Sequence, residues 1–327
     1  MKAVVCEEHG LPEQLVVRDV PVPVPGPGEV RVSVHAAGVN FMDTLIIRNL
    51  YQFKPDLPFV VGGEAAGVVE ALGAGVDDLS IGQRVVVMTG RGCFAEAVVA
   101  PRGHMVPVLA DMPFEDAVGF SMTYGTSLHA LNQRAALQPG ETLLVLGAAG
   151  GVGLSAVELG RLMGARVIAA ASSDEKLALA RKAGAQETIN YTTEDLKARA
   201  KVLTGGHGVD VVFDPVGDRF AEPAFRAIAW QGRYLVAGFA GGAIPSLPLN
   251  LPLIKGASII GVFWGAFTQA DPAAHHQNMA QLMVWYRAGQ LRPHLTHVYG
   301  LEQGPAAIRW MMDRKAMGKL ILHIRND

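Results

Sequence analysis

The sequence predicts an α/β protein in which a strand-rich segment is followed by a doubly wound parallel sheet. Three observations support this class. Up to about residue 110, short runs of alternating apolar and polar residues are separated by glycine and proline. From Asp111 onward, strand-like and helix-like segments alternate. A glycine-rich loop joins one apolar strand to the helix after it. The length of 327 residues suits about two domains.

In the first segment, residues 29–35 place valines on one face of a strand and polar groups on the other. Similar β-like runs occupy residues 66–71, 84–88 and 94–100, and turn-forming residues fill 21–28, 73–75 and 90–92. This pattern predicts a partly closed antiparallel barrel.

The second segment begins with a helix over 111–136, in which Pro113 lies near the start. We then expect strands at 142–146, 167–171, 188–190, 209–214 and 234–237. Helices are expected at 152–164 and 174–183, from 194, and in a segment that ends near Trp230. The chain continues with a strand at 258–264, helices at 275–289 and 303–314, and a strand at 320–324. Repeated alternation of this kind predicts a parallel, doubly wound sheet.

Composition excludes several classes of protein. The net charge is −2, from 28 basic and 30 acidic side chains, so we expect no nucleic-acid partner and no anionic membrane surface. No apolar run reaches the roughly 20 residues of a membrane span. The N-terminus becomes acidic within seven residues, unlike a signal peptide. Two cysteines exclude a disulfide framework and a four-thiolate zinc site, and favour a cytoplasmic location.

The loop at residues 147–153 carries the strongest functional signal. It follows an apolar strand and opens a helix, the context in which a glycine triplet predicts a Rossmann-type dinucleotide site. Gly150 lets backbone approach a diphosphate, and Gly153 lets the helix pack on the sheet. Ala148 replaces the usual first glycine. We expect the diphosphate to be bound by Ala149, Gly150, Gly151, Val152 and Gly153.

The end of the next strand predicts NADPH rather than NADH. An NAD enzyme places a carboxylate there for the ribose hydroxyl, whereas this chain has Ser172 and Ser173, with Lys176 one turn into the helix. Asp174 is the alternative acid, but its place directly before a helix favours a capping role.

Motifs spread along the chain resemble the zinc-free quinone oxidoreductases, related to zeta-crystallin, of the medium-chain dehydrogenase/reductase superfamily. They lie at residues 38–43, 62–67, 82–85, 94–96, 148–153, 189–191, 214–217, 232–238 and 318–320. The resemblance implies a chaperonin-10-like β-barrel domain over 1–124, completed by 265–327, and a Rossmann domain over 125–264. It also implies a homodimer joined partly by edge strands, here residues 258–264.

Zinc ligands of the alcohol-dehydrogenase branch are not present at the matching positions. Gly63 stands where that branch has histidine in a Gly-His-Glu motif, and residues 38–40 contain no thiol. Catalytic zinc needs three protein ligands. We therefore expect no metal.

The resemblance also assigns site residues. It places Asn40 near the nicotinamide, as an amide donor to substrate or cofactor, although turn formation explains Asn40 equally well. Tyr51 either orients a carbonyl or fills the core. Asp43 fits a cap or a structural partner better than a base. The remaining expected cofactor contacts, partly at strand ends, are Thr126, Tyr191, Gly238, Phe239, Phe263 and Trp264.

These features predict a metal-free, NADPH:quinone oxidoreductase-like enzyme. It would transfer hydride to quinones or related conjugated carbonyl compounds (enones), which disperse negative charge without a Lewis acid. The nearer alternative is an enoyl- or acrylate-type double-bond reductase. The more distant alternative is a non-enzymatic NADPH-binding regulator or RNA-binding protein, for which the sequence shows no basic stripe.

Overall fold

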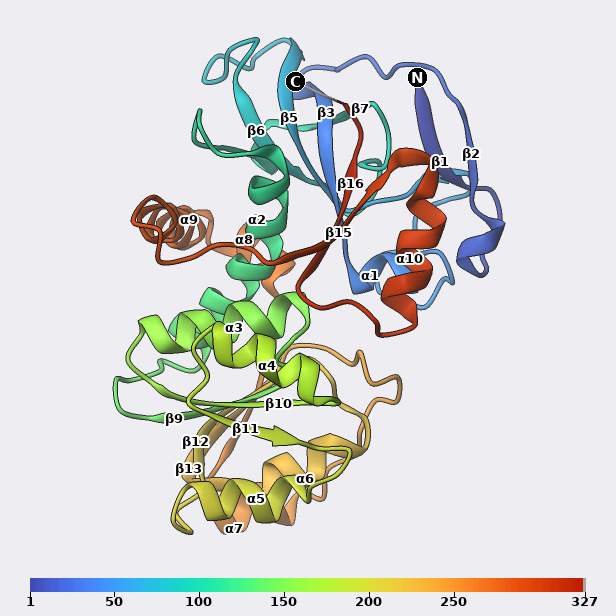
Figure 1. Ribbon diagram of the computed structural model, residues 1–327. Coiled ribbons are helices and arrows are strands. Elements are labelled where there is room, and N and C mark those ends of the chain that lie inside the picture. Colours follow the sequence, from blue (N-terminus) through green and yellow to red (C-terminus); the bar gives the residue numbers. More distant parts are fainter. Residues whose placement is uncertain (326–327) are drawn as a thin grey trace. The chain divides into compact units, whose positions relative to one another are not determined.

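The computed structural model describes residues 1–325 and divides into two compact units (Figure 1). Unit 1 comprises Met1–Met122 and Pro293–Asp327, and unit 2 comprises Thr123–Arg292. The boundary between them falls inside helix α2 (Phe114–His129). The predicted combination of a β-rich domain with an α/β domain is confirmed.

Unit 1 is built on a seven-stranded sheet, with the order β15-β16-β3-β5-β6-β8 and with β7 paired to β3. Its strands are β3 (Glu29–Val39), β5 (Glu64–Leu72), β6 (Arg84–Met88), β7 (Ala97–Pro101), β8 (Met105–Pro107), β15 (Leu295–Gly300) and β16 (Lys319–His323). A smaller sheet contains β1 (Lys2–Cys6), β2 (Val16–Asp19) and β4 (Phe59–Val60). Helices α1 (Phe41–Ile46) and α10 (Gly304–Met312) pack together in this unit.

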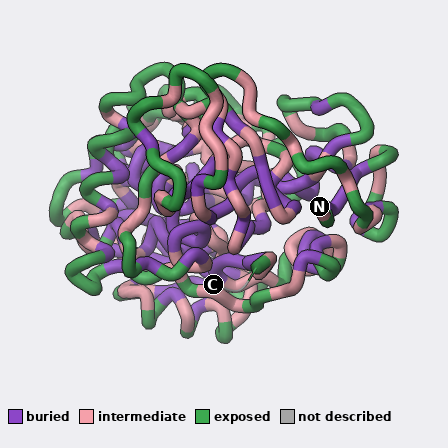
Figure 2. The backbone as a smooth tube through the Cα atoms, turned by 90° about the horizontal axis from the view of Figure 1, so that it is seen from above, coloured by how far each residue is buried: buried purple, intermediate pink, exposed green. Residues whose placement is uncertain are grey.

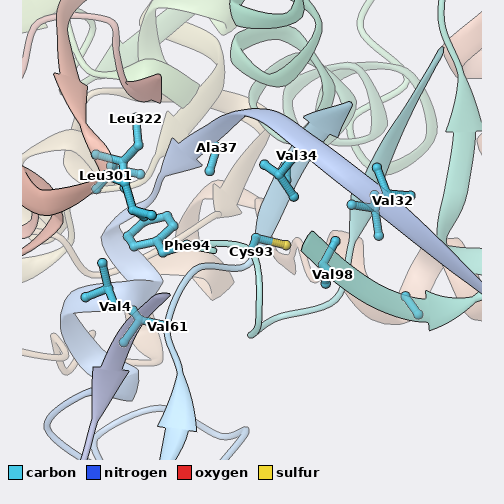
Figure 3. Packing of buried hydrophobic residues seen from close by; sticks show 14 of the residues in the cluster. Val4, Val32, Val34, Ala37, Val61, Cys93, Phe94, Val98, Leu301 and Leu322 are labelled. Carbon is cyan, nitrogen blue, oxygen red and sulfur yellow. The ribbon is translucent and has the colours of Figure 1, made fainter. Parts of the chain in front are cut away.

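The core of unit 1 follows from strand alternation. In β3, Val30, Val32 and Val34 are fully buried, while the residues between them are only half-buried. Figure 3 shows Phe94 among Val4, Val61 and Leu301, so segments far apart in the chain share this core.

Unit 2 holds a parallel sheet with the order β11-β10-β9-β12-β13-β14. Its strands are β9 (Thr142–Leu146), β10 (Arg166–Ala171), β11 (Glu187–Asn190), β12 (Val209–Asp214), β13 (Ile228–Val236) and β14 (Ser258–Gly261). The first strand is central and the order reverses between β9 and β12. This is the doubly wound Rossmann order, and the carboxyl end of β9 is its ligand-binding position.

The helices of unit 2 after α2 are α3 (Gly151–Leu162), α4 (Asp174–Lys182), α5 (Leu196–Leu203), α6 (Ala221–Arg226), α7 (Asn250–Lys255), α8 (Trp264–Ala270) and α9 (Pro272–Arg287). The residues at the ends of these helices include types that favour helix capping. In α4, for example, Ser173 is the N-cap, the first turn is acidic and the last turn is basic. In Figure 2 buried positions gather in the interior, and exposed ones lie mostly on peripheral loops.

Two element boundaries differ from the sequence-based expectation. Helix α6 ends at Arg226, and Trp230 belongs to β13, where it is exposed. Strand β14 ends at Gly261 rather than Trp264 because α8 begins at Trp264.

Residues 265–292, expected to complete the barrel domain, fall in unit 2. Contacts to His129, the last residue of α2, and to Gln133, just after that helix, hold them there. The rings of His129 and Phe267 stack with centroids 3.8 Å apart, and the side-chain amides of Gln133 and Asn278 exchange hydrogen bonds of 2.8 and 3.0 Å. Among residues 1–325, no helix has the length and apolar character needed to cross a membrane.

Candidate active site

The glycine-rich loop lies at the carboxyl end of β9, the central strand of unit 2. All five residues of β9 are buried, and α3 begins at Gly151 with Gly150 as its N-cap. The backbone N–H groups of Gly151, Val152 and Gly153 belong to the first helical turn and have no acceptor inside the helix. Together with the positive end of the helix dipole they suit an anion such as a diphosphate.

The two glycines of this loop are required for different reasons. A Cβ on Gly153 would lie 2.2 Å from the carbonyl oxygen of Gly147, so close packing at the start of α3 demands glycine. Gly150 has an ordinary φ of −77°. A Cβ added to Gly150 would have the Gly147 carbonyl oxygen as its nearest neighbour, at 3.5 Å, which is an ordinary contact. Neither φ nor packing therefore requires glycine at position 150. Glycine is a favoured N-cap residue, and it also leaves room for the close approach of a ligand. Ala148 and Ala149 have buried methyl side chains, and a methyl group has no donor or acceptor, so these residues can offer a ligand only backbone groups.

A second group of predicted residues meets at the end of β10. The Ser173 hydroxyl accepts a hydrogen bond from the backbone N–H of Lys176 (3.3 Å), and the Lys176 ammonium donates to the Ser172 hydroxyl (3.2 Å). Ser173, not Asp174, is therefore the N-cap, which corrects the capping role expected for Asp174. The Asp174 carboxylate instead accepts from the side chain of Asn190 (2.9 Å). Two hydroxyls and one ammonium are thus clustered at the end of β10.

Tyr191 follows β11 and lines a cavity of about 690 Å³ in unit 2. Its ring lies against Phe220, with centroids 4.2 Å apart. The charged residues of its lining are the basic Lys197, Arg219 and Arg226 and the acidic Asp195, Asp218 and Glu222. Arg226 is paired with Glu222 at 2.6 Å. Phe220 was not predicted from the sequence, where nothing but its place a few residues after β12 pointed to it. The aromatic wall suits the stacking of a planar ring, whereas the charged side chains of the lining are equal in number for the two signs.

The loop after β12 is fixed by a buried carboxyl group. One Asp214 oxygen accepts the N–H groups of Val216 (2.7 Å) and Gly217 (2.8 Å), and the other accepts from the Tyr234 hydroxyl. Burial raises the pKa of Asp214, and the Tyr234 hydrogen bond opposes that rise. Gly238 follows β13 and its N–H donates to the Asp214 carbonyl (3.3 Å). The predicted backbone contact at Gly238 thus lies beside this loop, as does Phe239, whose ring lies close to Gly217.

The adjacent residues Phe263 and Trp264, both predicted to contact the cofactor, have different environments in the structure. Phe263 is 59% exposed, whereas Trp264 is buried, packs on Gly125 and meets His275 edge-on with centroids 5.6 Å apart. The expectation that both rings end a strand is wrong, because Trp264 begins α8. Trp264 fills the core of its own unit. Thr126 is half-buried on α2, next to Gly125.

In unit 1 a buried polar cluster forms where three chain segments meet. This Lys319 cluster consists of Lys319 at the start of β16, Glu64 at the start of β5, and Asn40 and Asp43 at the start of α1. The Lys319 ammonium forms an ion pair with Glu64 and donates to Oδ1 of Asn40 (2.6 Å). Nδ2 of Asn40 donates to Oε1 of Glu64 (2.9 Å). Lys319, Glu64 and Asp43 are each at least 97% buried.

Asp43 closes the cluster on the side of α1. Its carboxyl accepts the backbone N–H of Asn40 (2.7 Å), which matches the structural role expected for it. Burial raises the pKa of Asp43 to about 7, against the opposing charge of Lys319. Tyr51 is half-buried and packs against the core of unit 1. Burial raises the pKa of Tyr51, and the charge of Asp43 adds to the rise.

The roles of Lys319 and Glu64 were not predicted. Each lies in a motif used for the family resemblance, but 255 residues separate them in the chain. Only the pairing of β16 with β3, and of β3 with β5, brings them together. Within residues 1–325, no three His, Cys, Asp or Glu side chains are grouped in a way that could hold a metal ion. The metal-free mechanism stays a prediction.

Comparisons with known proteins agree with these features. Residues 26–110 match the alcohol dehydrogenase GroES-like domain family, and residues 151–283 match the family described as zinc-binding dehydrogenase. The chain is 40% identical to quinone oxidoreductase-like protein 2 of Rattus norvegicus, over 99% of this chain and 92% of the relative. It is 32% identical to a 2-haloacrylate reductase of a Burkholderia species, over 98% of both.

A solved structure extends the likeness to the whole fold. The quinone oxidoreductase of Escherichia coli, crystallised in complex with NADPH, aligns with a TM-score of 0.92 at 28% identity. The alignment covers 99% of this chain and 100% of that one. With the Rossmann strand order, the glycine-rich loop and the barrel domain, these matches show an oxidoreductase. The chain belongs to the quinone oxidoreductase family of the medium-chain dehydrogenase/reductase superfamily.

Proposed function

We propose that this protein is an NADPH-dependent reductase that delivers hydride to quinones or related conjugated carbonyl compounds without a metal ion. The observation that carries the proposal is Gly150, whose missing side chain neither φ nor packing explains. A diphosphate lying against the N-terminus of α3 does explain it.

The choice of NADPH rests on the end of β10. Ser172, Ser173 and Lys176 offer two hydroxyls and a positive charge, and one carboxylate oxygen of Asp174 accepts a hydrogen bond from Asn190. These groups would bind the 2′-phosphate, and the cavity beside Tyr191 and Phe220 would accept the adenine end. Bound NADPH would supply the hydride.

Following the family resemblance, we assign Asn40 and Tyr51 of unit 1 to the positioning of the reacting groups. Asn40 would hold the reacting groups in place, and the Tyr51 hydroxyl would lie near the oxygen that gains a proton. A quinone or enone spreads the incoming negative charge over its own conjugated atoms. It therefore needs positioning and hydrogen bonds more than a Lewis acid, and the Gly63 position offers no metal ligand.

An acrylate-type substrate is the second candidate. The 2-haloacrylate reductase relative favours it, because a carbon–carbon double bond beside a carboxylate accepts hydride in the same geometry. The decisive experiment measures NADPH and NADH oxidation by the purified protein with a panel of quinones, enones and 2-haloacrylates. NADPH-dependent reduction of a quinone or enone supports the proposal. Preference for NADH, reduction of acrylates only, or stoichiometric zinc in the active protein refutes it.

We also propose that two copies form a homodimer through β14, the last strand in the sheet order of unit 2. Three of its four residues are exposed, among them Ile259 at 43%. An apolar edge strand of this kind needs cover. Sedimentation equilibrium of the wild-type protein and of an Ile259→Lys variant tests this, and a wild-type monomer at micromolar concentration contradicts it.

A further inference from the structure

Resting on the proposed binding of NADPH, we propose that Asn40 contacts its ligand as a hydrogen-bond acceptor, and that Lys319 and Glu64 fix it in that orientation. This reverses the donor role that the sequence suggested for Asn40. In this assignment Asn40 is the ligand-contacting residue, while Lys319 and Glu64 are positioning residues that act through it.

The orientation of the Asn40 amide follows from the chemistry of its neighbours. An ammonium group has only donors, so the atom facing Lys319 at 2.6 Å must be the oxygen Oδ1. A carboxylate has only acceptors, so the atom facing Glu64 at 2.9 Å must be Nδ2. Turning the amide over would place Nδ2 against the donors of Lys319 and Oδ1 against the acceptors of Glu64. The usual ambiguity between the oxygen and nitrogen of an amide is therefore absent here.

A count of hydrogen bonds then shows what Asn40 has left to offer. Nδ2 carries two hydrogens, and both have acceptors: Glu64 at 2.9 Å and the Gly38 carbonyl at 3.3 Å. Oδ1 can accept two hydrogen bonds and receives one, from Lys319. Asn40 is also only half-buried, unlike the charged members of the cluster. The group it can present to a ligand is one lone pair of an amide oxygen.

The packing around the cluster keeps this arrangement in place. A Cβ on Gly38 would lie 2.4 Å from Oε1 of Glu64 and 2.9 Å from the side chain of Lys319. Glycine at position 38 thus makes room for the ion pair next to the Asn40 amide. With Lys319 and Glu64 at least 97% buried, neither side chain has free space in which to swing away.

An acceptor selects ligands that carry an N–H or O–H donor. Two sources fit the proposed reaction: the carboxamide N–H of the nicotinamide, and the hydroxyl that forms when a quinone oxygen is reduced. The first would hold the cofactor ring in place. The second would stabilise the reduced product as its oxygen gains a proton.

The test compares each donor with a counterpart that lacks it, using wild-type protein and Asn40→Leu. Calorimetry gives the Kd of NADP⁺ and of its 3-acetylpyridine analogue, which keeps the carbonyl but has no amide N–H. Product inhibition gives the Ki of a hydroquinone and of its dimethyl ether. We expect Asn40→Leu to weaken binding about tenfold for the donor-bearing member of one pair and less than twofold for its counterpart. The pair that responds identifies the source.

Equal losses for both members of each pair, or no loss in either pair, would overturn the inference. Equal losses are expected if Asn40 acts as a donor, because its N–H could still bond to the carbonyl of the analogue. Wild-type protein that does not bind NADP⁺ at all refutes the proposed function, and this inference falls with it. The two failures are therefore distinguishable. The melting temperature of Asn40→Leu shows whether the variant is folded.

The positioning role has its own variant, Lys319→Met/Glu64→Gln, which removes both charges while keeping similar volumes. With the amide free to turn over, the wild-type preference for the donor-bearing ligand should fall at least threefold. The matched control is Lys2→Met/Glu302→Gln, the same exchange in an exposed ion pair of unit 1. A preserved preference in the cluster variant would overturn the positioning role. If that double variant does not fold, Lys319→Gln/Glu64→Gln, which also removes both charges, is measured by the same criterion.

Discussion

Exchanging each glycine of the nucleotide loop for alanine should separate binding from folding. Gly150→Ala adds a methyl group that meets nothing closer than the Gly147 oxygen at 3.5 Å, at an ordinary φ of −77°. Gly153→Ala adds the same methyl group 2.2 Å from that oxygen. The first variant should fold and lose nucleotide affinity, whereas the second should lose stability.

The magnitudes follow from these distances. For Gly153→Ala the helix or the loop must shift by about 0.8 Å to reach the 3.0 Å that real Cβ contacts respect. We expect this to cost about 2 kcal/mol after the gain in helix propensity, or about 4–8 °C in Tm. For Gly150→Ala the cost is that of a poorer N-cap, about 0.5 kcal/mol. A methyl group between the phosphate and the backbone should raise the Kd of NADPH about thirtyfold, or about 2 kcal/mol.

The assay combines thermal unfolding with NADPH titration followed by fluorescence, for wild-type protein and both variants. Because the same methyl group is added three residues apart, the two variants control for one another. Wild-type affinity in a folded Gly150→Ala variant would refute the ligand-based explanation of this glycine. A fully stable Gly153→Ala variant would refute the packing-based explanation of the other.

Three further predictions concern single side chains of unit 2. Lys176→Ala should raise the Kd of NADPH about tenfold and leave that of NADH unchanged in parallel titrations, because only the 2′-phosphate meets this charge. Burial raises the pKa of Glu158 from 4.5 to about 7, so the free energy of unfolding should fall by about 3 kcal/mol as pH rises from 4.5 through 7. Glu158→Gln should flatten this dependence in urea unfolding at several pH values. Tyr234→Phe removes a hydrogen bond to Asp214 and should cost about 2 kcal/mol in the same assay, and a neutral effect would contradict the proposed support of that loop.

Periodicity and turn residues were sufficient to predict the fold class and most of its elements. Buried parallel strands such as β9 are continuous apolar runs between glycine-rich turns, so their positions are local information. The end of β14 was not predictable in this way. Residues 258–264 form one apolar run, and only the packing of Trp264 on Gly125 and His275 turns its end into a helix.

The candidate site also contains residues that local sequence predicts and residues that only the tertiary structure brings together. Nucleotide-binding residues follow single strands, so a motif next to a strand places Gly150 and Lys176 without tertiary information. The Lys319 cluster depends on strand pairing across 255 residues and on which atoms face each other. The motif predicted that Asn40 lies in the site. The direction of its hydrogen bonds followed only from the structure.

The energetics of the cluster indicate that its charges are kept for orientation rather than for stability. A buried ion pair gains little net free energy, because desolvation of both charges offsets their attraction. Removing Lys319 alone would strand the Glu64 charge and cost about 3–5 kcal/mol, whereas neutralising both partners should be close to neutral. A neutral pair of similar size would pack as well but would leave both faces of the Asn40 amide acceptable. Only an ammonium on one side and a carboxylate on the other exclude the reversed orientation of the amide. We therefore expect the doubly neutral variant to keep its melting temperature. It should lose its discrimination between donor-bearing ligands and their counterparts.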